Sequence, residues 1–131
     1  MNFFEQIAGK VKQMASPAAG VRIAHVMLRT DEEALNYRTR GECYELLSVW
    51  KERIDGDPEK FDICARERSE CASRDRGGDL GFVTPLTRGS LSAAFRDVVF
   101  AGGGAAAPGV YGPIETESGL HLVYVHDAEA S

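Results

Sequence analysis

The segment ETESGLHLVYVHD, residues 115–127, contains an apolar run that predicts a β-strand, in which successive side chains point to opposite faces. The two faces would carry Leu120, Leu122 and Tyr124 on one side, and His121, Val123 and Val125 on the other. The imidazole of His121 therefore shares a face with two valines. A ring that can take a proton near neutral pH needs a hydrogen-bonding partner in such surroundings.

The length and charge of the chain restrict the class of protein. It has 131 residues, enough for one domain with a single hydrophobic core. Its formal net charge of −5 argues against general binding to nucleic acids or anionic membranes, because both depend on an excess of Lys and Arg. No apolar run approaches the roughly 20 residues that span a bilayer. We therefore expect neither nucleic acid nor membrane among its partners.

The cysteines and histidines give no metal-binding pattern. Cys43, Cys64 and Cys71 are an odd number and form no CxxC pair, which indicates free thiols in a reducing compartment. The cytoplasm is the expected location, and an organelle or the nucleus stays open. The three histidines show no HxxxH spacing, so we expect no metal and no other cofactor.

The first 19 residues differ from the rest of the chain. They contain no apolar core long enough for a secretory signal. Apolar side chains at helical spacing indicate a short amphipathic helix or a frayed tail: Phe4, Ile7, Val11 and Met14. We divide the chain into an N-terminal extension (1–19), a folded domain (20–128) and a short tail (129–131).

Residues 21–30, VRIAHVMLRT, predict a second strand because the run is apolar and bounded by turn-forming residues. Its faces would carry Ile23, His25 and Met27 on one side, and Ala24, Val26 and Leu28 on the other. A helix should follow, capped by Thr30 or Asp31. Its apolar stripe would consist of Leu35, Cys43, Leu46, Leu47, Trp50 and Ile54.

The remaining pattern completes an α+β domain. Pro58 should open a second helix after the breaker DGDP, with an apolar side made of Phe61, Ile63, Cys64 and Ala65. The further elements expected are a strand over 79–83, a helix over 91–100 that Ser90 or Ser92 caps, and paired strands over 110–115 and 120–125. Segregated helices and hairpin-linked strands indicate a small antiparallel sheet.

Four blocks of the chain resemble one known family. HVML (25–28), SECASRDRGGDLGF (69–82), RGSLSAAFRDVVF (88–100) and GPIETESGLHLV (112–123) stand in the order of the parvulin-type peptidyl-prolyl cis-trans isomerases. The resemblance covers residues 21 to about 127. It implies a four-stranded antiparallel sheet surrounded by three to four helices, with an FKBP-like superfold. It also implies proline-containing peptides or client proteins as partners, and we expect a monomer.

The resemblance assigns roles to particular residues. His25 and His121 match the family's paired histidines on adjacent central strands. Each ring would then give the other the hydrogen-bonding partner that an imidazole needs among apolar side chains. Thr116 and Ser118 match hydroxyl residues near that pair. Cys71 stands where the phosphorylation-directed members have cysteine and others have Asp.

The resemblance also implies a cup for the proline ring. Its walls would be Leu80, Phe82, Leu91 and Phe95. Without the family blocks, Leu91 and Phe95 at i and i+4 are ordinary core positions on a helix. Cys71, taken alone, is an ordinary loop thiol.

The implied reaction breaks no covalent bond. Rotation about an X-Pro bond is slow because amide resonance creates a barrier of about 18–20 kcal/mol. A catalyst therefore needs only to bind the twisted amide better than the planar one. We interpret His25 and His121 as structural tuners, with coupled tautomers, that do not donate protons to substrate. Protonation near an unperturbed pKa of roughly 6.5 should then disrupt the pair.

Phosphate-directed specificity is not expected to be strict. Phosphate-directed members carry a long basic loop after the first strand, but here Arg29, near the end of the strand 21–30, is the only base at that point and the acidic run TDEEA (30–34) follows. Arg74 and Arg76 are further candidates for contact with an anion. No WW domain is predicted, because the single tryptophan, Trp50, falls inside a predicted helix.

Three functional hypotheses stay open at this stage. The first is an active prolyl isomerase acting on client proteins. The second is a proline-segment-binding or chaperone module that has the fold and little catalysis. The third is catalysis by the thiol of Cys71, for which the sequence offers no activating helix or oxyanion loop.

Overall fold

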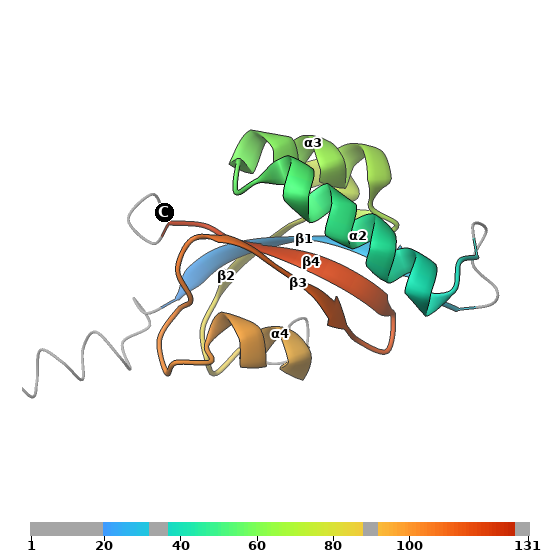
Figure 1. Ribbon diagram of the computed structural model, residues 1–131. Coiled ribbons are helices and arrows are strands. Elements are labelled where there is room, and N and C mark those ends of the chain that lie inside the picture. Colours follow the sequence, from blue (N-terminus) through green and yellow to red (C-terminus); the bar gives the residue numbers. More distant parts are fainter. Residues whose placement is uncertain (1–19, 32–36, 88–91, 128–131) are drawn as a thin grey trace, which may run out of the picture.

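The computed structural model describes residues 20–31, 37–87 and 92–127 of the chain, and these contain a four-stranded antiparallel sheet (Figure 1). Its strands are β1 (Val21–Arg29), β2 (Asp79–Val83), β3 (Gly109–Glu115) and β4 (Gly119–Val125). The strand order is β2-β1-β4-β3, so the two strands that carry His25 and His121 lie side by side in the middle. The expected α+β fold is confirmed.

Helices cover both faces of this sheet. The helices α2 (Arg40–Ile54) and α3 (Pro58–Arg68) lie on one face, and α4 (Ala93–Val99) lies on the other (Figure 1). A short 3-10 helix, η2 (Ala72–Arg76), leads from α3 into β2. The sheet thus separates two layers of packing.

Each face of the sheet has its own hydrophobic core. The core under α2 and α3 receives Ala24, Val26 and Leu28 from β1 and Leu120, Leu122 and Tyr124 from β4. The core under α4 receives Val21 and Ile23 from β1 and Val123 and Val125 from β4. The alternation predicted for both strands is confirmed. Because successive side chains of a strand point to opposite faces, both histidines lie on the α4 side.

The helix α2 begins later than the sequence pattern predicted. Thr39 is its N-cap, and a capping box joins the Thr39 side chain to the backbone of Glu42 and the Glu42 side chain to the backbone of Thr39. The expected cap at Thr30 or Asp31 is wrong for this helix, since Asp31 instead accepts hydrogen bonds from Arg29. Leu35 lies outside the described residues.

The helix α3 starts as predicted. Asp57 caps it by accepting a hydrogen bond from the backbone N–H of Glu59, and Pro58 occupies its first turn. Phe61 is buried, but Ile63 is 54% exposed, so the prediction that both belong to one apolar side of the helix is wrong. The two positions differ by 200° around a helix of 3.6 residues per turn, which places them on opposite sides.

The limits of the domain are only partly visible. The helix or tail expected in residues 1–19 and the tail 129–131 lie outside the described residues. Within the described part, no helix combines the length and the apolar character that crossing a bilayer requires.

Candidate active site

The two central histidines meet on the α4 face of the sheet. His25 is 5% exposed and His121 is 4% exposed. His25 stands opposite Val123 in the ladder between β1 and β4, so His121 is its diagonal neighbour on the same face. The Nδ1 atoms of the two rings lie 3.1 Å apart, and the rings are 5.3 Å apart between centroids at an interplanar angle of 16°. The structure therefore places the expected pair in direct contact.

A hydroxyl at each end extends the pair into a chain of four side chains. The Nε2 atom of His25 lies 3.1 Å from the Oγ atom of Ser73, and the Nε2 atom of His121 lies 2.6 Å from the Oγ1 atom of Thr116. Between the rings, one Nδ1 must donate while the other accepts. Fixing one tautomer consequently fixes the other, and all four ring nitrogens have a partner in either arrangement.

Burial keeps both rings neutral. Desolvation, with a smaller contribution from the positive charge of Arg76, lowers the pKa of His25 to about 4. Desolvation, followed by the neighbouring His25, lowers the pKa of His121 to about 3. The expectation that protonation near pH 6.5 disrupts the pair in the folded protein is therefore wrong. The cause is the loss of hydration, which penalises the charged imidazole.

The turn before β2 holds His25 and Ser73 together. The backbone N–H of His25 donates to the carbonyl of Gly78 at 2.9 Å, and the backbone N–H of Gly78 donates to the carbonyl of Ser73 at 2.9 Å. Gly78 has a φ of 77°, and a Cβ atom there would lie 2.0 Å from the carbonyl oxygen of His25. Only glycine permits this approach.

A cavity of about 610 Å³ opens in front of the paired rings, and we call it the central cavity. Phe95 of α4 forms its aromatic wall, with its ring edge-on to both imidazoles at centroid distances of 5.8 Å to His25 and 4.8 Å to His121. The other residues that line it are Met27, Cys71, Leu80, Ser92, Ala93, Ala94, Thr116, Glu117 and Ser118. An apolar hollow with a few polar groups converging on it is the usual form of a binding site.

Most of the candidate residues named from the sequence line this cavity. His25, His121, Thr116, Ser118, Cys71, Leu80 and Phe95 all do. Thr116 bonds to the histidine pair, whereas Ser118 is exposed and its backbone N–H donates to the Oγ1 atom of Thr116 at 3.2 Å. Leu91 lies outside the described residues.

Phe82 does not line the central cavity, and a bulge explains why. Ala24 pairs with Asp79 while Ile23 pairs with Gly81, so Leu80 is one residue in excess on β2. This extra residue puts Leu80 and Phe82 on different faces, although a regular strand would put them on the same one. Phe82 stands opposite Arg22 and is 56% exposed.

The three arginines considered for anion contact also lie outside the lining of the central cavity. Arg29 is paired with Asp31, and Arg74 has its Nε atom 3.8 Å from a carboxylate oxygen of Asp75. Arg76 donates to the backbone carbonyl of Asp79.

Among the site residues that sequence reasoning missed, Ser73 and Met27 have the closest relation to the histidine pair. Ser73 is 2% exposed and completes the hydrogen bonding of His25. The only available signal was its position two residues after Cys71 in the polar loop. Met27 follows His25 by two residues and was assigned to the same face of the strand, which could have identified it as a wall.

Comparison with known proteins identifies the family. Residues 25–127 match the model of the PPIC-type PPIase domain, the rotamase family. This match covers most of the chain, which therefore belongs to the family of parvulin-type peptidyl-prolyl cis-trans isomerase domains.

Individual relatives agree with this assignment. The dodo protein of Drosophila melanogaster is 37% identical over 91 residues, covering 70% of this chain and 51% of that protein. The peptidyl-prolyl cis-trans isomerase pin1 of Rhizopus delemar is 28% identical over 111 residues, covering 79% of this chain and 70% of its relative. The chain thus spans only about half of the dodo protein.

A solved structure supports the fold. The structure of the peptidyl-prolyl isomerase ESS1 from Candida albicans superposes with a TM-score of 0.69 at 26% identity. The superposition covers 94% of this chain and 74% of that chain.

Proposed function

We propose that this chain catalyses cis-trans isomerisation of X-Pro peptide bonds in client proteins, with the central cavity as its active site. The observation that carries the proposal is the position of Phe95. Its ring closes an apolar hollow directly against the paired imidazoles of His25 and His121. Family membership supplies independent support.

Phe95, Leu80 and Met27 provide the grip on the proline ring. All three line the central cavity, and burying a small apolar ring against such side chains contributes a few kcal/mol, at about 25 cal/mol per Å². With the ring held, the carbonyl side of the bond can rotate. Apolar walls also favour the twisted amide, because it has lost the resonance that separates charge in the planar form.

The polar groups of the cavity meet the moving carbonyl oxygen in this proposal. Cys71 and Ser118 line the same hollow as Phe95 and can donate hydrogen bonds to that oxygen. His25 and His121 act one layer below, where their neutral hydrogen-bonded chain fixes the position of Thr116. The histidines are therefore positioning residues.

The charges near the cavity favour substrates without a phosphate before proline. Among the described residues that line it, the only formally charged side chain is the carboxylate of Glu117. Arg29 is already paired with Asp31, and a phosphate would have to compete with that carboxylate. Neutral or apolar residues before proline are the preferred substrates in this proposal.

The compartment and the oligomeric state are part of the same proposal. Cys43, Cys64 and Cys71 are all free thiols, which favours a reducing compartment such as the cytoplasm. We also propose that the chain acts as a monomer.

NMR exchange spectroscopy on proline peptides tests the function. Peptides with Leu, Glu or phosphoserine before proline would be compared, and we expect the Leu peptide to isomerise at least as fast as the phosphoserine peptide. A phosphoserine peptide that is more than about tenfold faster, or about 1.4 kcal/mol, would contradict the proposed specificity. Binding of all three without any rate increase would select the non-catalytic alternative.

A matched pair of phenylalanine variants tests the site. Phe95→Ala should lower kcat/KM by at least about tenfold, because it removes a wall of the cavity. Phe82→Ala is the control, since Phe82 lies outside the cavity lining, and its kcat/KM should change less than about twofold. Circular dichroism would confirm that both variants fold, and Leu80→Ala provides a milder change of the cavity wall if Phe95→Ala does not.

A further inference from the structure

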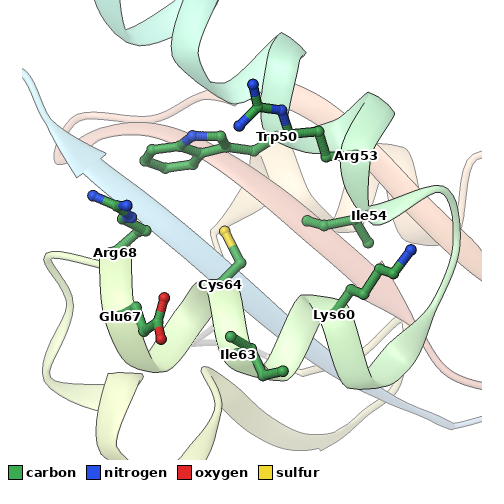
Figure 2. A pocket seen from close by; sticks show the side chains of 8 residues that line it. All are labelled: Trp50, Arg53, Ile54, Lys60, Ile63, Cys64, Glu67 and Arg68. Carbon is green, nitrogen blue, oxygen red and sulfur yellow. The ribbon is translucent and has the colours of Figure 1, made fainter.

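A second hollow lies on the opposite side of the sheet from the central cavity. It is a groove of about 390 Å³ between α2 and α3, and we call it the helical groove (Figure 2). The helix α2 contributes Trp50, Arg53 and Ile54, and α3 contributes Lys60, Ile63, Cys64, Glu67 and Arg68. None of these side chains lines the central cavity.

The floor of the helical groove is apolar. Trp50 extends its indole from α2 toward α3, and the thiol of Cys64 points toward that indole (Figure 2). Burial raises the pKa of the Cys64 thiol to about 11, so the sulfur stays uncharged. Ile63 is 54% exposed, although it is a large aliphatic side chain. These groups would lose exposed apolar surface if a partner side chain entered.

The rim of the helical groove is positively charged. Arg53, Lys60 and Arg68 are exposed, and within the described part of the chain none of them forms a salt bridge. Of the described residues that line the groove, only Glu67 carries a carboxylate. This concentration of cations occurs on a chain whose formal net charge is −5. The groove therefore differs in sign from the protein as a whole.

We propose that the helical groove docks an acidic peptide segment of a partner protein. An aliphatic or aromatic side chain of that segment would pack against Trp50 and Ile63, and its carboxylates would pair with Arg53 and Arg68 at the rim. Association of this kind gains from apolar burial at the centre and from complementary charge at the edge.

Other occupants fit the groove less well. The first 19 residues of this chain carry Lys10 and Lys12 against a single carboxylate, Glu5, so their charge has the same sign as the rim. A second copy that presented the same groove would place like charges opposite each other. A nucleic acid would meet the net negative charge of the remaining surface.

Fluorescence of the intact chain tests the proposal, because Trp50 is its only tryptophan. The probes are two proline-free peptides with the same leucines, one containing Glu and Asp and the other Gln and Asn at the same positions. The acidic peptide should change the emission of Trp50 saturably and should bind at least about tenfold more tightly than the amide peptide, a difference of about 1.4 kcal/mol. Raising the salt concentration to about 0.5 M should weaken that binding, since exposed charges are screened.

Two double variants locate the contact. Arg53→Gln with Arg68→Gln should weaken binding of the acidic peptide about tenfold. Arg40→Gln with Arg66→Gln is the matched control, because it removes one cation from each of the same helices outside the helical groove and should leave the affinity unchanged. The absence of proline from the peptides separates this test from isomerase activity.

Several results would overturn the proposal. They are equal affinity for the acidic and amide peptides, no response of Trp50 to either peptide, and unaltered binding to the rim variant. A response to phosphatidylserine vesicles or to an oligonucleotide, with none to the acidic peptide, would also overturn it. Self-association that quenches Trp50 without peptide would assign the groove to a second copy instead.

Discussion

The burial of the two histidines predicts that acid weakens the fold before it affects catalysis. The folded-state pKa values are about 4 for His25 and about 3 for His121, whereas an unfolded histidine titrates near 6.5. Between pH 6.5 and 5 the unfolded chain therefore binds protons at both positions while the folded chain binds almost none. The stabilisation by the neutral pair is fully present above pH 6.5 and is lost as the pH falls toward 4.

The magnitude follows from proton linkage. Each histidine contributes a slope of about 1.4 kcal/mol per pH unit over this window, so a drop of about 1.5 units costs about 2 kcal/mol per ring and about 4 kcal/mol for the pair. A domain of this size has only about 5–15 kcal/mol of total stability. Urea unfolding at pH 5.0, 5.5, 6.0, 6.5 and 7.5 measures the loss directly.

A variant of the third histidine provides the control. His126 also has a lowered pKa, chiefly through desolvation, so His126→Gln removes its share of the pH dependence. The steep slope should persist in His126→Gln because His25 and His121 remain. Isomerase activity of the still folded protein should stay flat between pH 5.5 and 8. An unfolding free energy independent of pH over this window, or an activity that titrates near 6.5 in a folded protein, would refute the reasoning.

Three further predictions concern the residues around the pair. Ser73→Ala should lower the free energy of unfolding by about 1–3 kcal/mol at pH 7.5, because it leaves Nε2 of His25 without its partner, and an unchanged urea midpoint would contradict this. Gly78→Ala should destabilise the protein far more than Gly81→Ala. Both glycines have a φ of 77°, but only the new methyl group at position 78 meets a backbone oxygen. Equal urea midpoints for the two variants would argue against this contact. Cys71→Asp should keep kcat/KM within about tenfold of wild type in the peptide assay, whereas complete loss in both Cys71→Asp and Cys71→Ala would favour thiol catalysis.

Local patterns predicted much of the fold and part of the site. Alternation placed His121 with Val123 and Val125, and the turn residue Pro58 marked the start of a helix correctly. The errors arose where a local signal had a competitor. Thr39 and Glu42 form a complete capping box, which prevailed over the isolated capping residues Thr30 and Asp31. A bulge at Leu80 turns Phe82 away from the expected cavity wall. The pattern of side chains along β2 alone does not show a bulge, because a bulge is a shift in the pairing with β1.

The order of apolar and polar side chains along single elements is a property of the chain, because strands and helices repeat with fixed periods. That order was enough to place each histidine on one face of its own strand, and only the family blocks indicated that the two rings form a pair. The hydrogen bond between His25 and His121, the partner that Ser73 supplies and the depressed pKa values depend on groups that are 48 to 96 residues apart in sequence. Only the packed sheet brings these groups within 3.1 Å and excludes water from them, so only the tertiary structure decided the chemistry of the site.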